Sequence, residues 1–223
     1  MFHIVTMSKI KALINPVTPF AQNAPIIYCE NTRQCAFVDP GGDIELLIQI
    51  AANNSLIPSK ILLTHGHADH AGGATQLSEI LQINIIGPQK EDLFLLESLE
   101  EQGKMFGIEA INCLPHVWLN DGDEVMLGDA LLSVLHCPGH TPGHIVFFNK
   151  ASKLAIVGDV LFRGSIGRTD LPKGNHEHLI VSIKEKLWPL GNEVIFISGH
   201  GPISSFGQER ADNAFVADGI LED

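Results

Sequence analysis

The sequence predicts an α+β protein in which two β-sheets pack face to face, with helices on their outer sides. Short apolar runs that are typical of buried strands occur in both halves of the chain, and segments with helical spacing interrupt them. The chain of 223 residues is long enough for one sizeable core, and no repeat or low-complexity linker divides it. We therefore expect a single domain over residues 1–223.

A hairpin and a helix are predicted near the N-terminus. Two apolar runs, Ile26–Cys29 and Cys35–Val38, flank a polar turn, which is typical of an antiparallel pair of strands. The turn sequence Asp39–Gly42 follows the second run. Asp43 then stands where an N-cap would precede a helix that packs on the sheet.

The same patterns predict the later elements. A short apolar strand over Lys60–Thr64 runs directly into His65. Helical spacing of apolar residues predicts further helices over Gly72–Gln82, Gln89–Met105, Glu177–Leu187 and Gln208–Val216. Short apolar runs predict further strands over Ile83–Ile86, Glu124–Leu127, Leu131–His136, Ile145–Phe148, Leu154–Val157 and Val194–Ile197.

Composition argues against several classes of protein. The formal net charge is -12, whereas phosphate contacts to nucleic acids need Lys or Arg. No run reaches the roughly 18 apolar residues that span a bilayer, and Met1–Ile10 lacks the pattern of an export signal. We expect a cytoplasmic protein with no nucleic-acid or membrane partner and with free, buried thiols at Cys29, Cys35, Cys113 and Cys137.

A histidine-rich segment carries the chemistry. Residues 65–70 read His-Gly-His-Ala-Asp-His, so four potential metal ligands directly follow an apolar strand. Imidazole nitrogen and carboxylate oxygen are both zinc ligands, and a tight loop at a strand end can turn such side chains toward one point. The alternative is a polar surface loop, but such a loop has no reason to follow a buried strand with this spacing.

Three further candidate ligands lie far along the chain, each near the end of a predicted strand. They are His140, Asp159 and His200, and each stands beside a glycine that permits close backbone approach. Taken singly, a His or Asp beside glycine is more often a cap or turn residue. Together with the first segment they supply seven ligands, which suits two metal ions that share one bridging carboxylate.

These motifs resemble those of the metallo-β-lactamase superfamily. The segments His140–His144 and Gly158–Phe162, with Gly167–Asp170, further resemble the glyoxalase II (hydroxyacylglutathione hydrolase) branch in its short, single-domain type. The likeness extends from about Pro16 to His200. It implies a four-layer αββα sandwich with the site at one edge of the two sheets.

The resemblance also implies a role for each candidate ligand. The ligands of a first metal ion would be His65, His67 and His140. The ligands of a second ion would be Asp69, His70 and His200. Asp159 would bridge the two ions. Asp39 and His144 would support the site without binding a metal.

The implied function is that of a binuclear metallohydrolase. Two divalent ions, expected to be zinc although the ligands also accept iron or manganese, would hold a bridging hydroxide that attacks a thioester carbonyl. Asp69 would orient this hydroxide as the catalytic residue, and Arg168 matches a basic position that contacts glutathione. The expected substrate is a small-molecule glutathione thioester of the S-D-lactoylglutathione type, converted to glutathione and a hydroxy acid.

Other functions remain open at this point. A persulfide dioxygenase of the same superfamily would use one iron at His65, His140 and Asp159, but that family commonly has Thr-Gly where this chain has Ala71–Gly73, which favours the hydrolases. A metallohydrolase of another ester, thioester or lactone, or a non-enzymatic metal-binding module, are further alternatives. Only residues 201–223 follow His200, so we expect no C-terminal glutathione-binding domain. The oligomeric state is left open.

Overall fold

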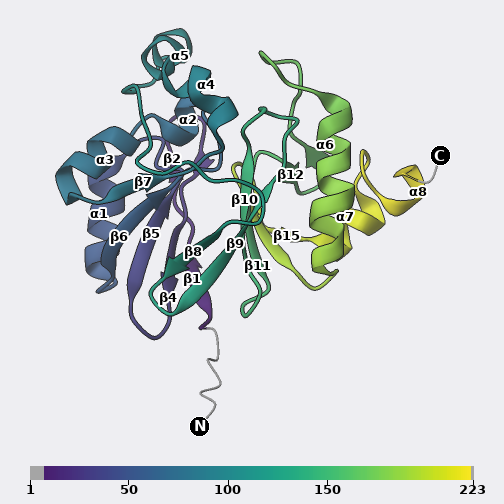
Figure 1. Ribbon diagram of the computed structural model, residues 1–223, viewed down its shortest axis with the longest axis horizontal. Helices are drawn as coiled ribbons and strands as arrows, with labels where there is room; N and C mark the ends of the chain where they lie inside the picture. The colour runs from purple at the N-terminus through teal and green to yellow at the C-terminus, as the bar shows by residue number, and fades with distance from the viewer. Residues whose placement is uncertain (1–7, 222–223) are drawn as a thin grey trace.

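The computed structural model describes residues 8–221, so the prediction for Met1–Ile10 lies mostly outside the described residues. Two β-sheets face each other, and helices cover their outer faces (Figure 1). This arrangement confirms the predicted four-layer αββα fold. In the part of the chain that the structure describes, no helix is both long and apolar enough to pass through a lipid bilayer.

The first sheet is built from the N-terminal half. Its strand order is β1-β4-β5-β6-β7, with bounds Ile10–Leu13, Ile26–Cys29, Gln34–Val38, Ile57–Leu62 and Asn84–Ile86. β4 and β5 pair antiparallel as the predicted hairpin, and β5, β6 and β7 run parallel. The crossover helices α1 (Ile44–Asn53) and α3 (Ala74–Leu81) cover its outer face (Figure 1).

The second sheet is built from the C-terminal half. Its strand order is β15-β14-β11-β10-β9-β8, with bounds Ser204–Ser205, Ile195–Ser198, Leu154–Gly158, Ile145–Asn149, Ala130–His136 and Glu124–Leu127. Only β11 and β14 pair parallel in this sheet, within the described residues. Its outer face is covered by α6 (His176–Ser182), the π-helix η2 (Ile183–Leu187), the 3₁₀ helix η3 (Trp188–Leu190) and α7 (Phe206–Asp212).

Smaller elements complete the described chain. Two short hairpins are formed by β2 (Pro16–Val17) with β3 (Gln22–Asn23) and by β12 (Leu161–Phe162) with β13 (Ser165–Ile166). The last described helix is α8 (Asp218–Leu221).

Strand β5 shows how the layers are held together. Successive side chains of a strand point to opposite faces. Cys35 and Phe37 pack under the helices of the first sheet, whereas Ala36 and Val38 pack against the second sheet. Both faces of the strand are therefore buried, which is why its sequence is almost continuously apolar. All four cysteines are buried and free, as predicted.

The predicted helix over Gln89–Met105 is broken in the structure. It forms the 3₁₀ helix η1 (Lys90–Asp92), α4 (Leu93–Leu96) and α5 (Leu99–Phe106). The Ser98 hydroxyl donates a 2.9 Å hydrogen bond to the Phe94 carbonyl, and such local bonds compete with helix continuation.

Asp43 stands at the predicted N-cap position of α1, but its side chain does not cap the helix. Its backbone is left-handed, with φ 51°, and its side chain makes no capping hydrogen bond to α1. An N-cap residue typically has an extended backbone that aims its oxygen at the first helical amides. The Asp43 carboxylate instead accepts a 2.8 Å hydrogen bond from the Thr18 amide, so it anchors the β2–β3 turn.

Candidate metal centre

The histidine-rich segment forms a sharp turn at the end of β6. The helix α2 (Ala68–Ala71) begins directly after His67, and the His67 carbonyl accepts hydrogen bonds from the amides of His70 (3.1 Å) and Ala71 (2.8 Å). This turn fixes Asp69 and His70 by local hydrogen bonds, close to the histidines that precede it.

The second half brings in three side chains from separate loops. Asp159 directly follows β11, and His200 follows β14. Because β11 and β14 are parallel neighbours, their carboxyl ends meet at one edge of the sheet, and the Gly199 amide donates a 2.8 Å hydrogen bond to the Gly158 carbonyl there. His140 lies in the loop between β9 and β10.

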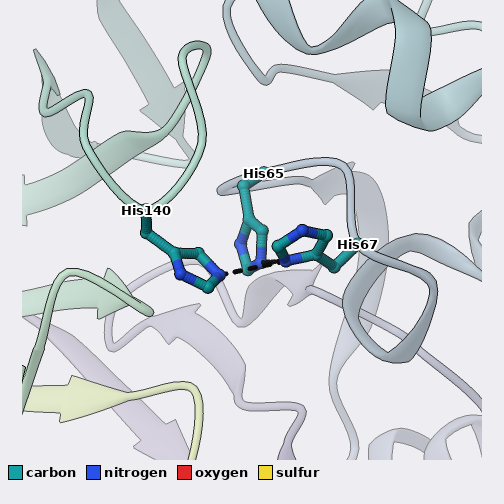
Figure 2. Close-up of side chains that lie close together, drawn as sticks. All are labelled: His65, His67 and His140. Atoms are coloured by element: carbon teal, nitrogen blue, oxygen red, sulfur yellow. Dashed lines mark hydrogen bonds between the residues drawn. The ribbon is translucent and has the colours of Figure 1, made fainter. Parts of the chain in front are cut away.

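Three histidines converge on one point, and we call them the first group: His65, His67 and His140 (Figure 2). Nδ1 of His67 lies 3.1 Å from Nε2 of His65 and 3.0 Å from Nε2 of His140. Ligand nitrogens around a tetrahedral zinc ion lie about 3.3 Å apart, so this spacing fits a metal ion. Burial lowers the pKa of His65 and His67 well below the usual value, which keeps both in the neutral, metal-binding form.

Beside them lies a second group: Asp69, His70 and His200. Oδ2 of Asp69 is 3.2 Å from Nε2 of His200 and 3.7 Å from Nε2 of His70. Burial opposes ionisation of Asp69, but His70 and His200 hold the pKa of its carboxyl well below its usual range.

Asp159 stands between the two groups. Its Oδ1 lies 3.4 Å from Nε2 of His70, and its Oδ2 lies 3.6 Å from Nε2 of His140 and 3.8 Å from Nε2 of His200. The structure therefore brings together all seven side chains that the sequence singled out, with Asp159 between the two groups.

Two observations show that these residues fit cations. Nε2 of His70 and Oδ1 of Asp159 are buried without a hydrogen-bond partner among the described residues, and buried polar atoms are otherwise almost always paired. Burial alone would lower the pKa of His70, but the carboxylates of Asp159, Asp69 and Asp39 together raise it to about 10. Positive charge is thus strongly favoured at this point, and a divalent cation would supply it.

Asp39 and His144 support the ligands from behind. Oδ2 of Asp39 lies 3.0 Å from Nδ1 of His70, the ring nitrogen turned away from Asp69, and the same carboxylate accepts hydrogen bonds from the Thr64 amide (2.7 Å) and hydroxyl (2.6 Å). Nε2 of His144 accepts a 3.0 Å hydrogen bond from the Asp159 amide. The supporting roles expected for both residues stay predictions, because Asp39 also lies with His65 and His70 in a third group whose ligand atoms are within 4.8 Å of one another.

Gly199 allows Asp159 and His70 to lie close to the backbone before His200, because it has no side chain. A Cβ atom at this position would lie 2.0 Å from Oδ1 of Asp159 and 2.5 Å from the His70 ring. Any other residue would push these side chains apart, so the glycine before His200 is a requirement of the site.

Comparison with known proteins agrees with this geometry. The family model of the metallo-β-lactamase superfamily matches residues 17–200. The chain belongs to the metallo-β-lactamase superfamily. It is 46% identical to hydroxyacylglutathione hydrolase GloC of Haemophilus influenzae over 205 residues, which cover 91% of this chain and 96% of that protein.

Two crystal structures resemble this metallo-β-lactamase-fold chain closely. BLEG-1, described as a B3 metallo-β-lactamase, has a TM-score of 0.84 and 34% identity over 93% of this chain and 99% of its own. TTHA1623, solved in a di-iron-bound form, has a TM-score of 0.83 and 34% identity over 92% of this chain and all of its own. The chain is a metallohydrolase of this superfamily, and its groups of His and Asp side chains are of the kind that hold metal ions.

A cleft of ≈ 530 Å³ opens above the metal-facing side chains of this superfamily member. Its floor contains His67, Asp69, His140, Asp159 and His200. Its apolar lining consists of Phe20, Phe106, Ile108, Phe162, Ile166, Leu171 and Pro202. The cleft therefore combines apolar walls with a few polar side chains at its floor, a combination that is common in ligand-binding sites.

Arg168, the candidate for binding glutathione, and two nearby basic residues, Arg163 and Lys173, differ in their partners. Arg168 lines the cleft, but its guanidinium makes two 2.7 Å hydrogen bonds to Asp170. Lys173 lies over the Phe94 ring, 3.9 Å from its centroid. Arg163 lines the cleft and has no ion pair or side-chain hydrogen bond with any described residue. The substrate-binding role of Arg168 stays a prediction.

Sequence reasoning missed two residues that hold the site together. The Asn23 amide donates hydrogen bonds to the carbonyls of Ser198 (3.0 Å) and Gly201 (2.9 Å), on both sides of His200. Asp92 is fully buried although it lies in a charged segment with helical spacing. Neither residue belongs to a recognisable motif, since their partners are distant in sequence.

Proposed function

We propose that this protein hydrolyses glutathione thioesters of the S-D-lactoylglutathione type with the help of two divalent metal ions. The observation that supports this most is the position of Asp159 between two groups of metal-facing side chains at the floor of a cleft. The 46% identity to a hydroxyacylglutathione hydrolase supports the choice of substrate.

The two groups would hold one ion each, and Asp159 would contact both. Bound divalent cations supply Lewis acidity, which makes water nucleophilic near neutral pH and stabilises negative charge on a carbonyl oxygen. Zinc is our first choice, because three of the ligands form an all-histidine set. Iron is the second, because the similar TTHA1623 binds two iron ions.

The chain's own residues bind and orient the reactants. The Asp69 carboxylate lies at the floor of the cleft and stays ionised, so it can accept a hydrogen bond from the attacking water and orient it. The apolar walls exclude other water from the carbonyl. Arg163 and Arg168 would attract the carboxylates of glutathione. The leaving thiolate is a weak base and needs no dedicated acid.

We further propose that the protein works in the cytoplasm. Its four thiols are free and buried, which suits a reducing compartment, and glutathione is the main thiol of such compartments.

Elemental analysis of the purified protein, combined with a thiol-release assay on S-D-lactoylglutathione, tests the proposal. Two metal ions per chain with turnover would support it. A fully metallated protein without thioester hydrolysis would contradict it. One iron per chain with oxygen uptake on glutathione persulfide would favour the dioxygenase alternative, and faster cleavage of a β-lactam would favour the activity named for BLEG-1.

A further inference from the structure

Asp92 connects the two loops that carry the first group. Its Oδ2 accepts hydrogen bonds from the Gly66 amide (2.9 Å) and the Thr141 hydroxyl (2.8 Å), and its Oδ1 accepts one from the Gly143 amide (2.6 Å). Gly66 lies between His65 and His67, and Thr141 directly follows His140. One carboxylate therefore binds both parts of the first group.

The surrounding backbone is shaped for this contact. A Cβ atom on Gly143 would lie 2.7 Å from Oδ1 of Asp92 and 2.5 Å from the Gln89 carbonyl oxygen. A Cβ atom on Gly66 would lie 2.7 Å from Cβ of Leu95. Both loops approach the Asp92 segment as closely as a glycine allows.

We infer that Asp92 is a positioning residue that sets the distance between His140 and the pair His65–His67 before a metal ion binds. The inference rests on the proposed metal binding by the first group. Partners that orient metal ligands typically change metal affinity by about 10- to 100-fold. The second group has a different carboxylate partner, because Asp39 contacts His70 there and no hydrogen bond joins Asp92 to Asp69, His70 or His200 in the described chain. Asp39 reaches the first group only through the Thr64 hydroxyl, which lies 3.0 Å from Nδ1 of His65.

Burial of a carboxylate costs free energy, and replacement of a buried carboxylate leaves its hydrogen-bond donors without an acceptor. The side chain of Asp92 is 0% exposed, and burial raises the pKa of its carboxyl to about 6. The Asp92→Asn variant keeps the shape but directs an amide N–H toward at least one donor. We expect it to separate the two loops slightly and to leave the second group unchanged.

The test is a titration of metal-free protein with Zn²⁺ in competition with a chelator, repeated with Co²⁺ to follow the visible spectrum of each site. For Asp92→Asn we expect one of two binding steps to weaken about 10- to 100-fold, with a changed spectrum for that step only. An unchanged pair of affinities, or an equal loss at both steps, would overturn the inference. A wild-type protein that binds no metal would instead contradict the proposed function.

Glu209 offers a matched control. It is also a buried carboxylate, and it accepts hydrogen bonds from the Gly164 amide (2.7 Å), the Ser204 hydroxyl and the Asn213 amide (2.7 Å), but none of these residues belongs to the metal-binding loops. Glu209→Gln should lower stability without changing either metal affinity. If Glu209→Gln lost as much metal affinity as Asp92→Asn, general destabilisation of the fold would explain both results.

A smaller change keeps the test valid if Asp92→Asn does not fold. Thr141→Val removes one of the three hydrogen bonds to Asp92 with little change in volume. We expect the same binding step to weaken severalfold. An unchanged affinity in this folded variant would overturn the inference on its own.

Discussion

The two halves of the chain contribute to the metal centre in different ways. The first half supplies four candidate ligands within six consecutive residues, on a turn that its own backbone hydrogen bonds define. The second half supplies His140, Asp159 and His200 from three loops. His67 and His140 are in contact although 73 positions separate them.

This difference shows which parts of a site are local and which depend on the whole fold. The turn from His65 to His70 needs little more than the end of β6 and the start of α2. The second-half ligands meet it only when β11 and β14 pair in parallel and the two sheets pack together. Damage to the second half should therefore affect both groups, whereas damage to the first half can affect one group alone.

The strongest test of this view is Asp159→Asn, since Asp159 contacts both groups. Loss of one carboxylate charge between the two groups should reduce kcat/KM by at least about 100-fold and lower the metal content. Elemental analysis and the thiol-release assay measure both effects. Full metal content with near-normal activity in this variant would contradict the proposal that Asp159 contacts both metal ions.

Asp39→Asn should have a smaller and more local effect. Asp39 contacts His70 in the second group directly and reaches His65 of the first group only through the Thr64 hydroxyl, so its loss should weaken metal binding at the second group by about 10- to 100-fold and at the first group less. Zn²⁺ titration with a competing chelator resolves the two steps. Equal weakening at both steps would show that the first-half ligands are not oriented independently.

Arg163 and Arg168 lie close together in sequence on the second-half wall of the cleft and form a matched pair of positions. Arg168 is already bound to Asp170, so Arg163→Ala should raise KM for an anionic thioester more than Arg168→Ala does, by about five- to tenfold. kcat should change little in either variant, since the Arg168 carbonyl that contacts Nδ1 of His140 remains. A larger increase in KM for Arg168→Ala than for Arg163→Ala would support the glutathione-binding role that the family resemblance implies for Arg168. A neutral thioester is the control, because neither variant should alter its KM.

Ser205→Ala should have the smallest effect. The Ser205 hydroxyl caps α7 by accepting a 3.2 Å hydrogen bond from the Gln208 amide, and loss of such a cap costs about 1 kcal/mol. We expect a melting temperature lower by about 2–4 °C with unchanged metal content. Loss of metal from this folded variant would mean that metal binding depends on the α7 cap, which lies outside the loops that carry the candidate ligands.

Much of the fold could be predicted from the sequence, because its strands carry dense local signals. The hairpin of β4 and β5 was correct, and the strand before His65 was correct in place, although it covers Ile57–Leu62 and not Lys60–Thr64. The break in the segment Gln89–Met105 was not foreseen, because it depends on Ser98 bonding within its own turn and on Asp92 turning into the interior. The partners of Asp92 stand 26, 49 and 51 positions away, and a single sequence does not reveal such pairs.

The candidate site divides in the same way. All seven candidate ligands could be selected from residue type, strand ends and family resemblance, and the structure places them together. The supporting contacts of Asn23 with the carbonyls around His200 could not be selected, because a polar side chain that bonds to backbone leaves no motif. The pairing of Arg168 with Asp170, which leaves Arg163 as the unpaired arginine of the two among the described residues, likewise became visible only in three dimensions.

One wall of the cleft is built separately from its floor. Phe20 lies in the β2–β3 turn and Phe106 at the end of α5, and their rings meet edge to face with centroids 6.1 Å apart. Neither residue belongs to a strand or turn that carries a candidate ligand. Mutations of Phe20 and Phe106 can therefore change the shape of the cleft without moving the candidate metal ligands. Proteins that share this metal centre can in this way come to prefer different substrates.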